Sequence, residues 1–375
     1  MALEGVELIR RRPRMYLGST DEGGMRQLAW ELVDNAVDEA LSGACNRILV
    51  TLHADGSLSV ADNGRGIPVD LDPRFNRPAV EVVLTTLRSG VNTLRGRRVA
   101  GGRHGVGLAV VNALSERLQV RVHRGGAEHV QEYRRGVPVG AVAEVGPSGR
   151  HGTTIRIWPD RDVFQNPRFD REALRRRLRE LAFLNEGLSL VLVNEATGRH
   201  ETYSADDGIV SFVRHLNHGA APLDPIPFFV QRSIGWTHIE IALQFTHGSA
   251  KRVLAFANHV HMDEGGSHLD GFRAALARVL DSHARDSGMT GATAPVLSAE
   301  DVGEGLTAVI SVMLLHPRFE GPDRTRLGNA EVEDQVAAVL SEALGPYLDR
   351  RPADARTIVE RSLAAARRRQ ADRGH

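Results

Sequence analysis

Residues 101–110 read GGRHGVGLAV, a glycine-rich turn that runs directly into an apolar segment. The four glycines of this stretch permit backbone torsions that aim successive N–H groups at one point. A helix beginning near Val106 would add its positive end, so the stretch is suited to binding an anion such as phosphate. It is neither a GxGxxG turn after a first strand nor a GxxxxGK[ST] loop, which disfavours a dinucleotide-binding fold and a P-loop.

Two polar motifs precede this stretch. A helix is predicted over residues 25–42, and it places Glu31 and Asn35 four residues apart on one face. There, a carboxylate can orient water beside an amide oxygen that ligates Mg²⁺. Asp62 ends a predicted strand before the turn NGRGIP, and its carboxylate can accept a hydrogen bond from an exocyclic amino group such as that of adenine. Taken alone, a solvated helix face and a local Asx turn are the commoner explanations of these motifs.

The composition is that of a globular protein. The chain has 375 residues, of which 42% are hydrophobic and 25% charged, enough for about two domains. Lys+Arg and Asp+Glu balance at 47 each, so no net field attracts polyanions. Lys251 is the only lysine, and Cys45 is the only cysteine, which excludes a disulfide framework and a CxxC metal site. Without a signal peptide or a long apolar run, we expect a cytoplasmic, non-membrane protein.

The hydrophobic pattern indicates two units. In the first we expect a hairpin turning at Asp55-Gly56, strands around 118–134 and 153–158, and helices over 25–42, 78–89, 106–115 and 168–184. A second unit is predicted from about residue 207. Its expected elements are a helix at its start, strands around 238–245 and 252–258, a helix over 267–284, the strand TAVISVMLL, and helices over 329–350 and 353–370.

The order of the motifs is more specific than any one of them. ELVDN begins at Glu31, DNGRGIP at Asp62, GGRHGVG at Gly101 and HGTT at His151. Together they closely resemble the GHKL ATPase superfamily and, within it, the N-terminal region of the B subunits of bacterial type II topoisomerases, DNA gyrase and topoisomerase IV. Further strings, such as RRPRMYLGSTD, GGSHLDGFRAAL and EDVGEGLTAVISV, extend the resemblance from residue 8 to about residue 370.

The resemblance implies an α/β (α+β) fold and an activity. Residues 1–206 would form a GHKL (Bergerat) ATP-binding α/β sandwich, and residues 207–375 a ribosomal S5-like transducer domain with a C-terminal helix. The implied protein is an ATPase that uses ATP and Mg²⁺ and forms a homodimer on ATP binding. The family's TOPRIM domain and cleavage subunit are not in this sequence, so we expect no complete topoisomerase, but a piece of a longer subunit or a stand-alone homologue.

The resemblance also implies a role for individual residues. Glu31 matches the general base, Asn35 the magnesium ligand, and Asp62 the adenine anchor, helped by Thr153. Glu39 and Arg65 match an ion pair beside the base. The other implied nucleotide contacts are Gly66, Ile67 and Pro68 in the turn, and Gly101, Gly102, Arg103, His104, Gly105, Val106 and Gly107 in the lid over the triphosphate.

The sequence departs from the family in a second loop. Where the family usually has Gln-Thr-Lys reaching the γ-phosphate, this chain has Pro322, Asp323 and Arg324. Arg324 can replace the lysine's charge and is the second predicted catalytic residue, although a guanidinium is larger and planar. Pro322 lacks the glutamine's amide, and Asp323 adds a negative charge. Asn92 also stands where the lid usually has lysine, so we expect ATP binding with slow or altered hydrolysis.

Three functions are compatible with these residues. The first is an ATPase gate that dimerises on ATP. The second is a nucleotide-gated regulatory module that acts through a partner, such as a gyrase-type subunit or, through the basic tail AAARRRQADRGH, DNA. The third passes the γ-phosphoryl group to a small-molecule acceptor in a biosynthetic reaction.

Overall fold

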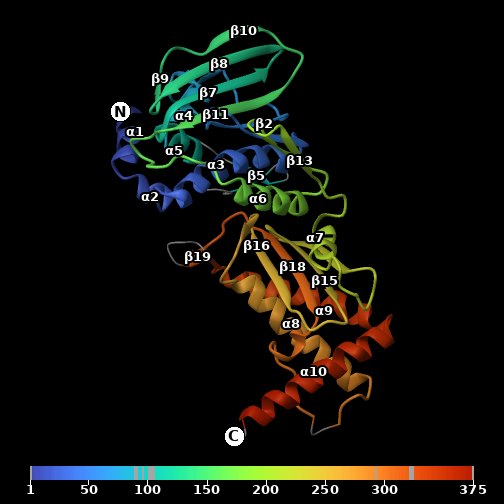
Figure 1. Ribbon diagram of the computed structural model, residues 1–375. Helices are drawn as coiled ribbons and strands as arrows, with labels where there is room; N and C mark the ends of the chain where they lie inside the picture. The colour runs from blue at the N-terminus through green and yellow to red at the C-terminus, as the bar shows by residue number, and fades with distance from the viewer. Residues whose placement is uncertain are drawn as a thin grey trace. The chain divides into compact units, whose positions relative to one another are not determined.

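Two compact units make up the structure, Met1–Asp206 and Asp207–His375, and both are traced in Figure 1. Each has its own sheet and hydrophobic core. Of residues 92–94 and 97–99 the backbone alone is described. The structure is a computed structural model, and it describes residues 2–87, 92–94, 97–99, 106–291, 294–320 and 325–373.

One large mixed sheet organises the first unit. Its strands run in the order β10-β8-β7-β11-β2-β1-β12-β13, with β9 pairing β8, and every neighbouring pair is antiparallel except β1 with β12. The predicted hairpin at Asp55-Gly56 is confirmed as the β1–β2 connection. The strands are β1 (Arg47–Leu52), β2 (Leu58–Asp62), β7 (Ser115–Arg124), β8 (Ala127–Arg134), β9 (Val137–Pro138), β10 (Ala143–Pro147), β11 (Gly152–Pro159), β12 (Ser189–Asn194) and β13 (Arg199–Tyr203).

Helices α3, α5 and α6 gather on one face of this sheet (Figure 1). The burial along β7 alternates, as expected for a strand with one covered face: Leu118, Val120 and Val122 are buried, while their neighbours are more exposed. Short two-residue and three-residue strands fill the connections: β3 (Leu71–Asp72), β4 (Arg77–Pro78), β5 (Asn92–Leu94) and β6 (Arg97–Val99). The helices are α1 (Ala2–Arg11), α2 (Pro13–Leu17), α3 (Glu22–Leu41), α4 (Ala79–Thr85), α5 (Gly107–Ala113) and α6 (Arg171–Leu184).

Helix α3 carries the first predicted motif. It begins three residues before the predicted start because the Asp21 side chain caps it, accepting a hydrogen bond from the Gly23 N–H at 2.8 Å. Leu32, Val33, Ala36 and Val37 are buried in the core, and the polar residues between them form a partly exposed face.

The second unit has a five-stranded sheet in the order β14-β15-β18-β16-β17. Strand β18 is buried at every position, as expected for a strand covered on both faces; α7 contacts it, and so does α8. The elements are α7 (Gly208–Leu216), β14 (Phe228–Ile234), β15 (Thr237–Phe245), β16 (Arg252–Ala257), β17 (Val260–His261), α8 (Ser267–Asp286), the 3₁₀ turn η1 (Asp301–Gly303), β18 (Leu306–Met313), β19 (Phe319–Glu320), β20 (Arg326–Leu327), α9 (Ala330–Asp349) and α10 (Pro352–Arg373).

The start of α8 is joined to β20, which lies just after residues 321–324. The Leu327 N–H donates to the Gly265 carbonyl at 3.1 Å. A Cβ on Gly266 would lie 2.3 Å from the Leu327 carbonyl oxygen, so only glycine allows this approach. Arg326 adds an ion pair to Asp270 of α8 at 2.6 Å. The stem of the loop is therefore fixed to the first turn of α8.

Helices α8 and α9 pack too closely at Gly271 for a side chain. A Cβ there would lie 2.2 Å from the Glu333 carbonyl oxygen of α9. Gly271→Ala is therefore expected to lower the free energy of unfolding by about 1–3 kcal/mol, although alanine favours the helix. The measurement is urea denaturation followed by circular dichroism. As a matched control, Ala274→Gly on the exposed side of α8 is expected to cost only the helix propensity, about 1 kcal/mol. A stabilised Gly271→Ala protein would contradict the close packing.

Candidate functional site

Glu31 lies where helices α3 and α5 meet. A Cβ on Gly107, the first residue of α5, would lie 2.1 Å from Glu31 Oε2, so the backbone of α5 rests directly against this carboxylate. Gln27, one turn earlier on α3, donates from Nε2 to Glu31 Oε1 at 2.7 Å. The predicted base and the end of the predicted lid are therefore brought together, and the glycine makes their approach possible.

The polar face of α3 continues past Glu31. Among the residues that the structure describes, Asn35 has no hydrogen-bond partner for its side-chain amide, so this amide is open to a ligand. Asp38 stands one turn further on. Burial, together with repulsion from Asp34, Glu39 and Glu31, raises the pKa of its carboxyl well above the ordinary value. The motif-based prediction of site residues left Asp38 out. Its signal was its position, seven residues after Glu31 and three after Asn35, on the same helix face.

Asp62 joins two strands at the other end of the site. Its Oδ1 accepts hydrogen bonds from the Gly64 N–H at 2.8 Å and from the Thr153 N–H at 3.3 Å. No described residue donates to Oδ2, which leaves that oxygen for a ligand. Burial raises the pKa of Asp62 to about 6, against the effect of the two N–H groups. The carboxylate is thus a half-buried acceptor with one oxygen fixed and one available.

The turn after Asp62 is fixed by the segment that contains Thr153. Thr153 Oγ1 accepts a hydrogen bond from the Ile67 N–H at 3.1 Å. Gly152 has φ 123°, and a Cβ there would lie 2.0 Å from the Asp62 carbonyl oxygen. Gly66, at φ 76°, likewise has the His123 carbonyl 2.9 Å from the place of a Cβ. Both positions need glycine, because any side chain would collide with backbone.

Glu39 and Arg65 form an ion pair that ties this turn to α3. Arg65 Nη2 lies 2.7 Å from Glu39 Oε1, and the Nε and backbone N–H of Arg65 both donate to Glu39 Oε2 at 3.1 Å. Burial alone would raise the pKa of Glu39, but the Arg65 contacts outweigh it and the pKa is lowered. Such a bidentate pair fixes geometry as well as charge. The ion pair therefore fixes the turn after Asp62 relative to helix α3, which carries Glu31.

Several predicted site residues are less fully placed. Val106 directly precedes α5, Ile67 packs against the core, and Pro68 is exposed. Of Asn92 only the backbone, in β5, is described. Outside the described residues lie Gly101, Gly102, Arg103, His104 and Gly105 of the lid, and Pro322, Asp323 and Arg324 of the second loop.

The donor set fits a magnesium ion that is carried by a phosphate ligand. Within the described ranges, no group of three or more His, Cys, Asp or Glu side chains could hold a metal. Mg²⁺ typically takes one or two protein oxygens and completes its shell with phosphates and water. The open amide oxygen of Asn35 suits that role.

No described helix combines the length and the apolar character that spanning a membrane requires.

Two family models match the chain, one in each unit. Residues 20–163 match the family described as histidine kinase-, DNA gyrase B-, and HSP90-like ATPase, and residues 208–375 match the DNA gyrase B family. The DNA gyrase B protein of Clostridium acetobutylicum is 42% identical over 371 residues, and that of Staphylococcus aureus is 44% identical over 374. These alignments cover 98% of this chain but 58% of each relative, so the chain spans little more than half their length.

Solved structures match across both units. The 43K ATPase domain of Thermus thermophilus gyrase B, solved in complex with an aminocoumarin, has a TM-score of 0.85 and 39% identity, covering 99% of this chain and 97% of that one. The topoisomerase IV ATP-binding domain of Francisella tularensis, in complex with a small-molecule inhibitor, has a TM-score of 0.81 and 27% identity, with coverages of 97% and 98%.

The raised pKa of Asp62 predicts a pH-dependent cost to folding. Its pKa is about 6 in the folded chain and 3.8 ordinarily, so the folded chain holds this proton more tightly. Its contribution to stability is therefore complete at low pH and is lost as the pH rises from about 4 to about 6. Over this range the free energy of unfolding is expected to fall by about 3 kcal/mol relative to Asp62→Asn. Urea titrations of both proteins at several pH values test this, and a pH-independent difference would contradict it.

Proposed function

Since the chain belongs to the DNA gyrase B family of ATPases, we propose that residues 1–206 form its Mg²⁺-dependent ATP-hydrolysing domain and residues 207–375 its transducer domain. The observation that carries the proposal is the contact of the Glu31 carboxylate with the first residue of α5. The contact supports a role for Glu31 as the general base, because its carboxylate lies beside the end of the glycine-rich stretch that is suited to phosphate. Dimerisation on ATP binding belongs to the same proposal.

Adenine recognition rests on Asp62. Its open Oδ2 accepts the exocyclic amino group, while Oδ1 stays bound to Gly64 and Thr153. A guanine base presents a carbonyl at the equivalent position, which would face a carboxylate oxygen without a proton between them. The site is therefore specific for adenine nucleotides.

The hydrolytic step rests on Glu31 and Asn35. Gln27 orients the Glu31 carboxylate, which positions a water molecule and accepts its proton as the water attacks the γ-phosphorus. Asn35 supplies an amide oxygen to Mg²⁺, which, when bound with ATP, neutralises charge on the phosphate oxygens. A protonated Asp38 would spare the site one further negative charge beside the triphosphate. The Glu39–Arg65 ion pair keeps the adenine anchor and the base at a fixed separation.

The lid and the second loop complete the proposal. The glycines of 101–107 wrap the triphosphate, and Arg324 supplies a cation to the γ-phosphate. Because Pro322 and Asp323 stand where the family usually has a glutamine and a threonine, the proposal includes slow or altered hydrolysis. Partners of the gyrase type, a second protein subunit and DNA, would act through the transducer domain.

Removal of the base is the direct test. Glu31→Ala is expected to lower the rate of ATP-dependent phosphate release by about 10²–10⁴-fold, because proton transfer from the attacking water is lost. The variant is expected still to bind ATP and to dimerise with it, as measured by calorimetry and light scattering. Glu22→Ala, at an exposed carboxylate in the first turn of α3, is the matched control and should keep the full rate. Phosphate release that does not depend on Glu31 would sink the proposal.

The second loop offers an independent test by gain of function. Exchanging Pro322, Asp323 and Arg324 for Gln, Thr and Lys is expected to raise the turnover of ATP, because it restores an amide donor and a compact ammonium at the γ-phosphate. Steady-state phosphate release measures the change, and Arg324→Ala alone should lower it. If the triple exchange leaves turnover as it was, the loop does not set the hydrolysis rate.

A further inference from the structure

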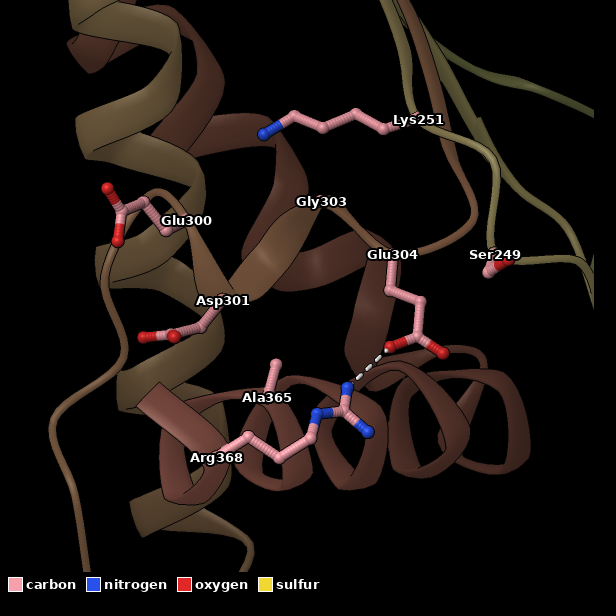
Figure 2. Close-up of a pocket in the computed structure, with 8 residues that line it drawn as sticks. All are labelled: Ser249, Lys251, Glu300, Asp301, Gly303, Glu304, Ala365 and Arg368. Atoms are coloured by element: carbon pink, nitrogen blue, oxygen red, sulfur yellow. Dashed lines mark hydrogen bonds and ion pairs between the residues drawn. The ribbon is translucent and has the colours of Figure 1, made fainter. Parts of the chain in front are cut away.

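A cavity of about 510 Å³ lies within the second unit, and the proposed ATPase chemistry makes no use of it. Figure 2 shows its walls: the segment before β16, the turn η1 with the residues around it, and α10. The charged groups that line it are Lys251, Glu300, Asp301, Glu304 and Arg368. The cavity is thus bounded by both signs of charge.

Lys251, the only lysine of the chain, extends into this cavity past Gly303 (Figure 2). A Cβ on Gly303 would lie 2.6 Å from Lys251 Cδ and 2.7 Å from both Cε and Nζ. The glycine therefore leaves the space that the lysine side chain occupies. Any other residue at position 303 would push the amine away.

The carboxylates around Lys251 are mostly engaged by other cations. Arg368 Nη2 lies 3.0 Å from Glu304 Oε2, the pair drawn in Figure 2. On the buried side, Arg369 Nη2 lies 2.8 Å from Asp301 Oδ2. In the part of the chain that the structure describes, the Lys251 amine itself has no hydrogen bond or ion pair. Because Lys251 is exposed, its amine can be reached from solvent.

The surroundings of Lys251 favour the neutral form of its amine. Partial desolvation and the positive charge of Arg273 on α8 lower the pKa of its ammonium, and Glu300 opposes them only in part. A lysine is nucleophilic only when neutral, so desolvation and a neighbouring cation are the means by which an amine is activated. Arg273 is exposed on α8, and no described residue pairs with it. It can therefore also attract an anionic reagent.

We propose that Lys251 is a site of N-acylation by small acyl phosphates. Lys251 Nζ attacks the carbonyl carbon of the donor, and a C–N bond forms. The bond from that carbon to the phosphate oxygen breaks, and phosphate leaves with the electron pair. The proton lost by the nitrogen passes through water to the phosphate. Arg273 attracts the donor's phosphate and balances the charge of the leaving group, and the product is an amide that no longer carries the lysine's charge.

The test uses the full chain and acetyl phosphate, with peptide mapping by mass spectrometry to separate Lys251 from the terminal amine. Lys251 is expected to be acetylated several-fold faster than Nα-acetyl-lysine amide in the same solution. Inorganic phosphate is expected to slow the reaction by competing for the attraction of Arg273. Gly303→Ala, which displaces the amine, should bring the rate down to that of the free reference.

Variants on the exposed face of α8 identify the role of Arg273 without disturbing the core. Arg273→Gln is expected to slow acetylation several-fold and to abolish the protection by phosphate. Arg278→Gln, at another exposed arginine of α8, is the matched control and should leave the rate unchanged. The proposal is overturned if Lys251 reacts no faster than the free reference, or if Arg273→Gln and inorganic phosphate both leave its rate unchanged.

Discussion

The arrangement of the site depends on the contact between Gly152 and the backbone of Asp62. Strands β2 and β11 are far apart in sequence, and their pairing brings the end of one to the start of the other. With a Cβ at position 152 the Asp62 carbonyl would have to move, and the Thr153 bonds to Asp62 and Ile67 would move with it. A residue without a side chain is thus a condition for the adenine end of the site.

Further contacts connect this part of the site to helices α3 and α5. The turn after Asp62 is tied to α3 by Glu39 and Arg65, and α3 in turn meets α5 at Glu31 and Gly107. Each of these joints combines a charged group with a glycine or a backbone N–H, and none relies on apolar contact alone. Hydrogen bonds and ion pairs of this kind favour one geometry, because a shift at one joint breaks a polar contact.

Local signals in the sequence were sufficient to predict many of the helices and one hairpin. The hairpin at Asp55-Gly56 and the helices α3, α6, α8, α9 and α10 follow from periodicity, caps and turn residues. The resulting errors are small: α6 begins at Arg171, three residues late, because Asp170 caps it through the Ala173 N–H at 3.0 Å. Pro352 marks the break between the last two helices, as a proline at the first helical position does.

Other features required the three-dimensional arrangement. The α1 and α2 helices were not predicted, since arginines dominate residues 10–14 and, of residues 5–11 in α1, Val6 and Ile9 alone are buried. Edge strand β14 lacks a clear alternation because its middle residues are exposed. The parallel pairing of β1 with β12 and the raised pKa of Asp38 both arise from long-range neighbours that no sequence window contains.

The joint between β20 and the first turn of α8 has a mechanical consequence. Strand β20 is held to the start of α8 by a backbone hydrogen bond, a close contact at Gly266 and the Arg326–Asp270 ion pair. Strand β20 and the first turn of α8 therefore move as one piece, and α8 packs against α9 without room at Gly271 for a side chain. A displacement of β20 would therefore be passed to α8 and α9 together.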